Sequence, residues 1–268
     1  MAVGTEGQGS YALFGNVGDE QLRRLKSSSA VWDEGTLRFL MGLGLATGWR
    51  CWEVGAGEGS VARAMAQVVG PTGHVVATDY DPHFLVSSAA QNLTVIEHDV
   101  VTEDPPGEGF DLVHARMLLQ HLPDREEAFR RMAESVAPGG WLALEDSDWI
   151  TFLVARPAIP ELRVLASALD AAMADAGFDS TCGFGNVTRL NDSGFEDVRG
   201  QGHVLVMRGR STGVTWYHQW AASLRDSMVA AGYLTDDEFE RADAVLDDPS
   251  AAWLSQTLVA ACGRKPSK

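Results

Sequence analysis

The chain has 268 residues, of which 45% are hydrophobic and 22% charged, a length and composition typical of a globular protein with a full hydrophobic core. Its formal net charge of −16 disfavours nucleic acid and anionic membranes as partners. The three cysteines are scattered without metal-ligand spacing, which predicts a metal-free protein. No apolar stretch is long enough for a membrane span, and the first ten residues do not resemble a signal peptide, so we expect a cytoplasmic protein.

The N-terminal 34 residues are predicted to form an arm and a cap helix. Asp19 can cap a helix through about Ala30, and a second helix is expected near 33–43. Strand and helix signals then alternate, which is typical of a parallel α/β sheet covered on both faces. Strands are predicted near 50–54, 74–79, 93–98, 110–115, 140–147, 196–206 and 254–263. Helices are predicted near 60–69, 82–90 and 124–136.

Two segments, 151–182 and 209–248, carry helical apolar patterns outside this alternation. Both follow predicted strands at the edge of the sheet where open α/β folds bind ligands. We therefore expect two helical insertions that form a lid, although such patterns are also produced by ordinary core packing. The remaining boundaries assign 35–150 and 183–208 to the core and 249–268 to the last strand and tail.

A glycine-rich run follows the first predicted strand, with Glu53 before Gly55, Gly57 and Gly59, and Asp79 ends the next strand. Glycines let a ligand approach the backbone closely, and the helix that follows offers free N–H groups. An acid at the end of the second strand is placed to hold a ribose diol. The spacing G-x-G-x-G differs from the dinucleotide fingerprint G-x-G-x-x-G. Acids on both sides of the loop suit a ligand with an ammonium group better than one with a phosphate.

Together with further segments, this loop resembles the class I S-adenosylmethionine (SAM)-dependent methyltransferases over roughly residues 35–150. The matching segments are Glu53–Gly59, Asp79, His98–Val100, Phe110–Val113 and Ala137–Gly140, in the order and spacing of that family. The resemblance implies a Rossmann-like sheet of seven strands with the last one antiparallel. It also implies SAM as cofactor, S-adenosylhomocysteine (SAH) as product and a small organic acceptor. The branch of ubiquinone/menaquinone-type and bacterial natural-product enzymes is the most similar, which implies a role in natural-product biosynthesis.

The resemblance also implies a set of cofactor contacts. The glycine loop surrounds the amino-acid portion, the ends of the second and third strands hold ribose and adenine, and the segment after the fourth strand passes under the methyl donor. An N-terminal tyrosine and arginine are expected to reach the cofactor carboxylate. The predicted cofactor residues are Glu53, Gly55, Ala56, Gly57, Gly59, Asp79, Tyr80, Asp99, Val100, Ala115, Arg116, Tyr11 and Arg24.

Methyl transfer is an in-line displacement in which the protein mainly aligns donor and acceptor, with at most one proton removed by a base. Histidine is the natural base near neutral pH, so His121 is the first candidate and His114 the second, followed by Asp146. Each of these could equally be a structural residue. The predicted acceptor pocket is aromatic, although its members could also be ordinary core residues: Trp149, Phe152, Trp216, Tyr217 and Trp220.

Two other functions stay open at this level. An NAD-dependent oxidoreductase on a related fold is disfavoured by the loop spacing, by Glu53 and by the lack of a Tyr-x-x-x-Lys pair. A protein of the same fold that binds SAM without methylating is compatible with every motif. The sequence leaves open the acceptor, the methylated atom and whether the chain forms a homodimer.

Overall fold

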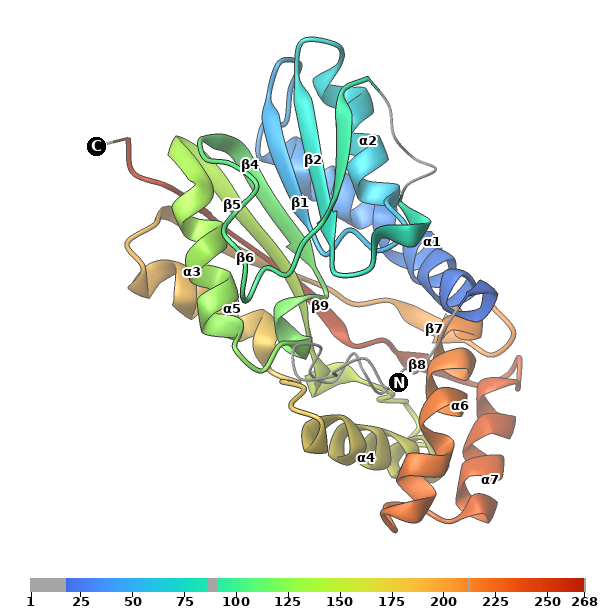
Figure 1. Cartoon of the computed structure of the whole chain (residues 1–268). Helices are drawn as coiled ribbons and strands as arrows, with labels where there is room; N and C mark the ends of the chain where they lie inside the picture. The colour runs from blue at the N-terminus through green and yellow to red at the C-terminus, as the bar shows by residue number, and fades with distance from the viewer. Residues whose placement is uncertain (1–17, 86–90, 212, 268) are drawn as a thin grey trace.

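The computed structural model describes residues 18–85, 91–211 and 213–267. Its centre is a seven-stranded sheet in the order β3-β2-β1-β4-β5-β9-β6, in which β9 runs antiparallel to both of its neighbours (Figure 1). The strands are β1 (Arg50–Val54), β2 (His74–Asp79), β3 (Leu93–Glu97), β4 (Phe110–Arg116), β5 (Val136–Asp148), β6 (Glu196–His203) and β9 (Thr257–Arg264). The predicted fold class, with its single antiparallel strand, is confirmed.

Helices cover both faces of this sheet. In chain order the described helices are α1 (Asp19–Gly42), α2 (Ser60–Val69), α3 (Arg125–Ser135), α4 (Pro160–Asp175), α5 (Cys182–Asp192), α6 (Val214–Ala230) and α7 (Asp236–Leu246). The sheet is covered by α1, α2, α3 and α5. On one face, Cys51, Val75 and Leu112 pack with apolar residues of α1 and α2. On the other, Trp52 and Val113 pack with residues of α3 and α5. Because strand side chains alternate between faces, every second residue of β1, β4 and β5 points toward α1.

The N-terminal helix differs from the prediction. Residues 19–42 form one continuous α1, whereas the sequence pattern predicted two helices. No proline interrupts the segment between them, and Trp32 is buried in the middle of the helix. A single internal glycine, Gly35, costs only about 1 kcal/mol relative to alanine and does not end a helix that packs along its length. The predicted helix over 82–90 lies partly outside the described residues, which show only a short 3₁₀ turn at Pro82–Phe84.

The two expected insertions form one helical cluster beyond an end of the sheet, where α4, α6 and α7 lie together (Figure 1). They share a separate apolar core that includes Leu162, Trp220 and Phe239. Two short strands that the sequence did not predict, β7 (Val206–Arg208) and β8 (Ala252–Leu254), pair beside this cluster. Helix α5 was not predicted either. The domain boundaries stay predictions.

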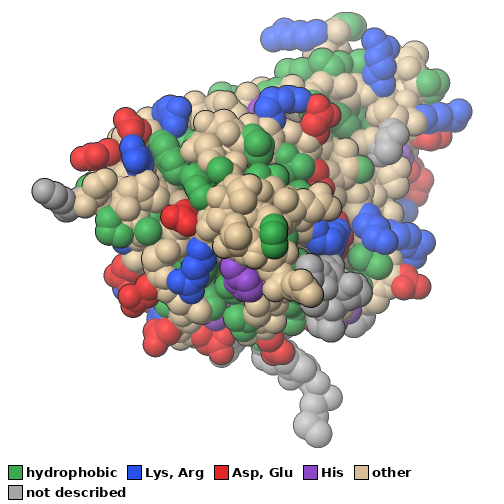
Figure 2. All heavy atoms as spheres, turned by 90° about the horizontal axis from the view of Figure 1, so that it is seen from above, with side chains coloured by type: hydrophobic (Ala, Val, Ile, Leu, Met, Phe, Trp, Pro, Cys, Tyr) green, Lys and Arg blue, Asp and Glu red, His purple; other side chains and the backbone are tan. Residues whose placement is uncertain are grey.

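Figure 2 shows acidic and basic side chains interspersed over one face of the molecule, as its mixed charge leads one to expect. Within residues 18–85, 91–211 and 213–267, no helix combines the length and the apolar character that crossing a bilayer requires.

Candidate active site

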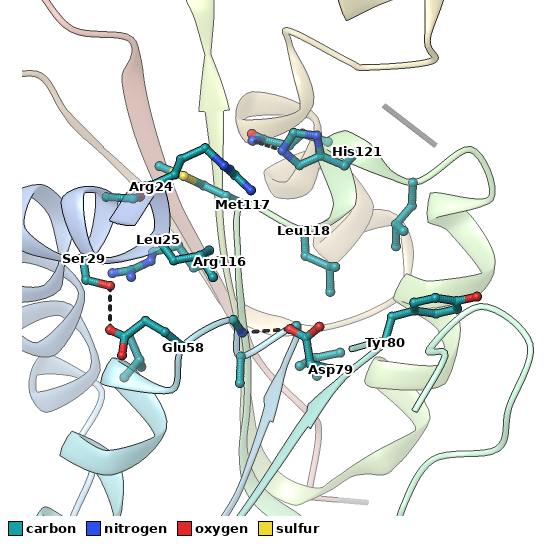
Figure 3. A pocket seen from close by; sticks show the side chains of 18 of the residues that line it. Arg24, Leu25, Ser29, Glu58, Asp79, Tyr80, Arg116, Met117, Leu118 and His121 are labelled. Atoms are coloured by element: carbon teal, nitrogen blue, oxygen red, sulfur yellow. Dashed lines mark hydrogen bonds between the residues drawn. The ribbon is translucent and has the colours of Figure 1, made fainter. Parts of the chain in front are cut away.

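A cavity of about 340 Å³ opens at the carboxyl ends of the parallel strands, between α1 and the helical cluster. One side, here called the loop side, consists of the glycine loop after β1 and the ends of β2 and β3. The opposite part, the aromatic side, consists of Gln120, His121, Ser147, Trp149, Met173, Phe178, Trp216, Trp220 and Gln256. In Figure 3, Asp79 of the loop side and His121 of the aromatic side face each other across the cavity, with Leu118 between them in this view.

The loop side depends on glycine backbone geometry. Gly55, Gly57 and Gly59 all have positive φ angles, of 66°, 57° and 84°. Side chains other than glycine rarely adopt this region, so the turn from β1 into α2 needs these residues. A Cβ atom on Gly55 would lie 3.0 Å from the Leu118 side chain. The loop therefore brings bare backbone to the cavity wall just before the N-terminus of α2.

Asp79 holds this loop in place from the end of β2. Its Oδ2 accepts a hydrogen bond from the Gly57 N–H at 2.8 Å, and its Oδ1 accepts one from the Asp81 N–H at 3.0 Å. Burial raises the pKa of Asp79 to about 6, although these two hydrogen bonds oppose the rise. Each carboxylate oxygen keeps a second lone pair for a ligand. A neutral diol would supply the matching donors.

Helix α1 forms the wall beside the loop and is tied to it by polar contacts. The Ser29 hydroxyl donates to Glu58 at 3.1 Å, and Arg63 donates to the same carboxylate at 2.7 Å. Arg116, at the end of β4, donates to Asp33 at 2.8 Å, which joins the sheet to the helix. These bonds fix the part of α1 that places Arg24 and Leu25 on the cavity wall (Figure 3).

Three charged side chains form a buried row beneath the loop, on neighbouring strands β1, β4 and β5. His114 Nδ1 lies 2.6 Å from Glu53 and its Nε2 lies 3.1 Å from Glu145, with all three residues 3% exposed or less. Burial alone would lower the pKa of His114. The charge of Glu53 and the hydrogen bonds to both carboxylates outweigh it and raise the pKa to about 9. His114 is therefore a charged partner that lies between two buried carboxylates and contacts both.

A directed chain of hydrogen bonds fixes the state of His121. The Ser147 N–H and hydroxyl both donate to Gln120 Oε1, each at 2.7 Å, and Trp149 Nε1 donates to the same hydroxyl at 3.1 Å. The other amide atom of Gln120 is therefore the NH₂ group, which lies 3.1 Å from His121 Nε2. That nitrogen accepts, so the proton of the neutral ring is on Nδ1. Burial, helped by the charge of Arg24, lowers the pKa of His121 to about 3.

We expect the His121 ring to stay neutral, with its proton on Nδ1, between pH 5 and 8. Long-range ¹H–¹⁵N NMR spectra of the histidines should show an unchanged Nδ1–H signature for His121 across this range. A His121 signal that titrates near pH 6.5 would contradict this assignment and support the role of a base.

The aromatic side has walls in two orientations. The rings of Trp216 and Trp220 are nearly parallel, 23° apart with centroids at 5.4 Å, and Trp149 meets Trp220 at 84° and 5.3 Å. The ring centroids of Phe178 and Trp149 are 5.0 Å apart. Since Ser147 binds the polar edge of Trp149, the walls are mainly apolar. A flat apolar ligand fits such a space.

The structure brings most of the sequence-predicted site residues to the cavity wall. These are Glu53, Gly55, Ala56, Gly57, Asp79, Tyr80, Asp99, Val100, Arg116, Arg24, His121, Trp149, Trp216 and Trp220. Others lie behind the wall: Gly59, Ala115, His114, Asp146, Phe152 and Tyr217. Tyr11 lies outside the described residues. Asp146 is held inside by Asn186 at 2.8 Å and by the Gln120 N–H at 3.3 Å.

The sequence analysis missed Gln120, Ser147 and Gln256, which line the aromatic side. Gln120 precedes His121 and Ser147 follows Asp146, so the sequence pointed to the correct segments but not to these two polar side chains. Gln256 stands in no motif, and only the fold brings it to the cavity.

Comparison with known proteins agrees with this geometry. Residues 52–142 match the model of a family described as a methyltransferase domain, and they include the glycine loop and Asp79. This segment is a methyltransferase domain. The structure of the chain superposes on YcgJ from Bacillus subtilis with a TM-score of 0.57 over 88% of this chain and 100% of that one, at 15% identity. Phosphoethanolamine N-methyltransferase 2 of Haemonchus contortus, bound to SAH, gives 0.56 over 88% and 53%, at 16% identity. These similarities concern the fold.

Sequence relatives of the methyltransferase domain include both fungal and bacterial proteins. Methyltransferase str2 of Strobilurus tenacellus is 33% identical over 130 residues, which cover 47% of this chain and 46% of that protein. The ubiquinone/menaquinone biosynthesis C-methyltransferase UbiE of Ectopseudomonas mendocina is 31% identical over 107 residues, 37% and 42% of the two chains. The chain thus spans less than half the length of these relatives.

Proposed function

We propose that the protein transfers the methyl group of SAM to a small organic acceptor. The observation that carries this proposal is the loop side of the cavity. There the glycine backbone, the start of α2 and the Asp79 carboxylate, which accepts two backbone hydrogen bonds, lie together. The fungal and bacterial methyltransferases to which the domain is similar support it. A role in natural-product biosynthesis is a further part of the proposal, supported by the similarity to str2.

The residues present fit the cofactor of this family. The Asp79 carboxylate is acceptor-only when ionised and would hold the ribose hydroxyls. The positive-φ glycines leave room beside Leu25, which a Cβ atom on Gly57 would approach to 3.4 Å. SAM supplies an electrophilic methyl group when bound. The chain itself would orient the acceptor on the aromatic side and exclude water from it, which accounts for much of the acceleration in such displacements.

His121 is not a base in a ready form, because it accepts a hydrogen bond at Nε2 and carries its proton on Nδ1. We propose that neutral His121 shapes the acceptor site and does not act as the base. Deprotonation by His121 stays an alternative that the NMR experiment above decides.

Titration calorimetry tests the proposed function directly. We expect SAM and SAH to bind in the micromolar range, about −8 kcal/mol, and NAD not to bind. With an acceptor present, SAH should accumulate in a coupled assay. Binding of NAD without SAH would replace the proposal by an oxidoreductase. Tight SAM binding without SAH formation on any acceptor of a broad panel would point to a non-methylating protein of this fold.

A further inference from the structure

A buried glutamine on the aromatic side has an unused hydrogen-bond donor. Gln256 lies between β8 and β9, is 3% exposed and lines the cavity. Its Oε1 accepts a hydrogen bond from the Tyr217 hydroxyl at 2.7 Å, which identifies the other amide atom as Nε2. Among the residues that the structure describes, Nε2 has no hydrogen-bond partner.

The anchor of this amide is itself rigid. Tyr217 is 3% exposed on α6, and its ring stacks with that of Phe152 at a centroid distance of 6.1 Å. The Gln256 backbone and the Ser255 side chain also lie beside the phenolic oxygen, whose hydroxyl donates to Gln256 Oε1. The NH₂ group is thus presented at the cavity, where an oxygen atom of a ligand can accept a hydrogen bond from it.

The charged side chains on the cavity wall itself are distributed unevenly between its two sides. The acidic residues on the cavity wall, within the described chain, are Glu53, Glu58, Asp79, Asp81 and Asp99, and all belong to the loop side. Arg24 reaches in from α1, and its charge acts on His121 (Figure 3). An ammonium group placed among the tryptophans would therefore meet the like charge of Arg24, and the described wall on this side offers it no carboxylate. An anionic or carbonyl oxygen would meet donors.

We propose that Gln256 selects the acceptor, which is a planar aromatic or conjugated molecule whose carboxylate, enolate or carbonyl oxygen receives a hydrogen bond from Gln256 Nε2. The ring lies against Trp216 and Trp220, and amines are excluded. This inference rests on the proposed function, since it assigns the acceptor of the same site.

Three small ring compounds of similar size serve as probes: benzoate, toluene and benzylamine. Each is titrated into the SAH-saturated protein at pH 7.5, and binding is followed by quenching of tryptophan fluorescence, because three tryptophans line the cavity. We expect benzoate to bind about tenfold or more tightly than benzylamine, with toluene between them. Equal or tighter binding of benzylamine, or no binding of benzoate, would overturn the proposal.

The variant Gln256→Glu keeps the shape and the acceptor for Tyr217 but replaces the NH₂ group with a second carboxylate oxygen. The preference should then invert, with benzoate weakened and benzylamine strengthened by about tenfold each. Gln201→Glu, the same change on exposed β6, is the matched control and should leave both values unchanged. An unaltered ratio of affinities in Gln256→Glu would reject the role of Gln256.

SAH affinity is measured for each variant by calorimetry before the probes are added. If the wild-type protein does not bind SAH, the proposed function is refuted. Normal SAH binding with the wrong probe preference would refute the acceptor assignment alone.

Discussion

Replacement of Asp79 by asparagine should weaken SAH binding by about 1–3 kcal/mol, or roughly ten- to a hundredfold. The amide removes the charge, and its NH₂ group faces one of the two N–H groups, of Gly57 or Asp81, that the carboxylate now binds. Calorimetry with SAH measures the change. The matched control is Asp104→Asn, at a fully exposed carboxylate, which should bind SAH as the wild type does.

The same carboxylate should make binding depend on pH. Since the pKa of Asp79 is raised to about 6, lowering the pH from 7 to 5 protonates it in the free protein. The protonated group is a poorer acceptor for a diol, so SAH affinity should fall by about tenfold over this range. Asp146 titrates in the same window but does not line the cavity. A pH dependence that persists in Asp79→Asn would therefore exclude Asp79 as its cause.

The second large effect is expected at His114, whose replacement by leucine removes the cation that lies between the buried carboxylates of Glu53 and Glu145. Removing one partner of a buried ionic network costs about 3–5 kcal/mol. Urea denaturation at pH 7 should show this loss in the free energy of unfolding. The variant that combines His114→Leu with Glu53→Gln and Glu145→Gln should recover a large part of it, because no unpaired charge remains. A loss below about 1 kcal/mol in the single variant would contradict the role of His114 as a buried cation.

The pH dependence of stability follows with a definite sign. The folded pKa of His114, about 9, lies above its unfolded value. Its contribution to stability is therefore complete below about pH 6.5 and is lost as the pH rises through about 9. Wild-type protein should unfold more readily at pH 10 than at pH 7, and the triple variant should lose this part of the dependence.

Much of the fold could be predicted because local patterns determined it. The observed boundaries of β1, β2 and α2 agree with the predicted ranges, because the apolar runs of these elements end at glycine or aspartate. Long-range packing decided the rest. Helix α1 continues through the expected break because Trp32 is buried there, and the β7–β8 pair depends on segments some 45 residues apart meeting in space.

The candidate site divides in the same way. The loop side could be found from the spacing of Gly55, Gly57 and Asp79. The proton position on His121 could not, because it depends on the Gln120 amide, whose orientation is set by Ser147 on β5. His114 was proposed as a base from its position alone, and only the geometry shows a carboxylate on each side of its ring.

The matched family segment, 52–142, ends before most of the aromatic side begins. Trp149, Trp216, Trp220 and Gln256 all come from later parts of the chain. The loop side and the aromatic side of the cavity thus come from different parts of the chain. Substitutions on the aromatic side can therefore change which acceptor binds while the loop side stays the same. Sequence identity over residues 52–142 consequently carries little information about the acceptor. The residues that would distinguish acceptors lie in the C-terminal half of the chain.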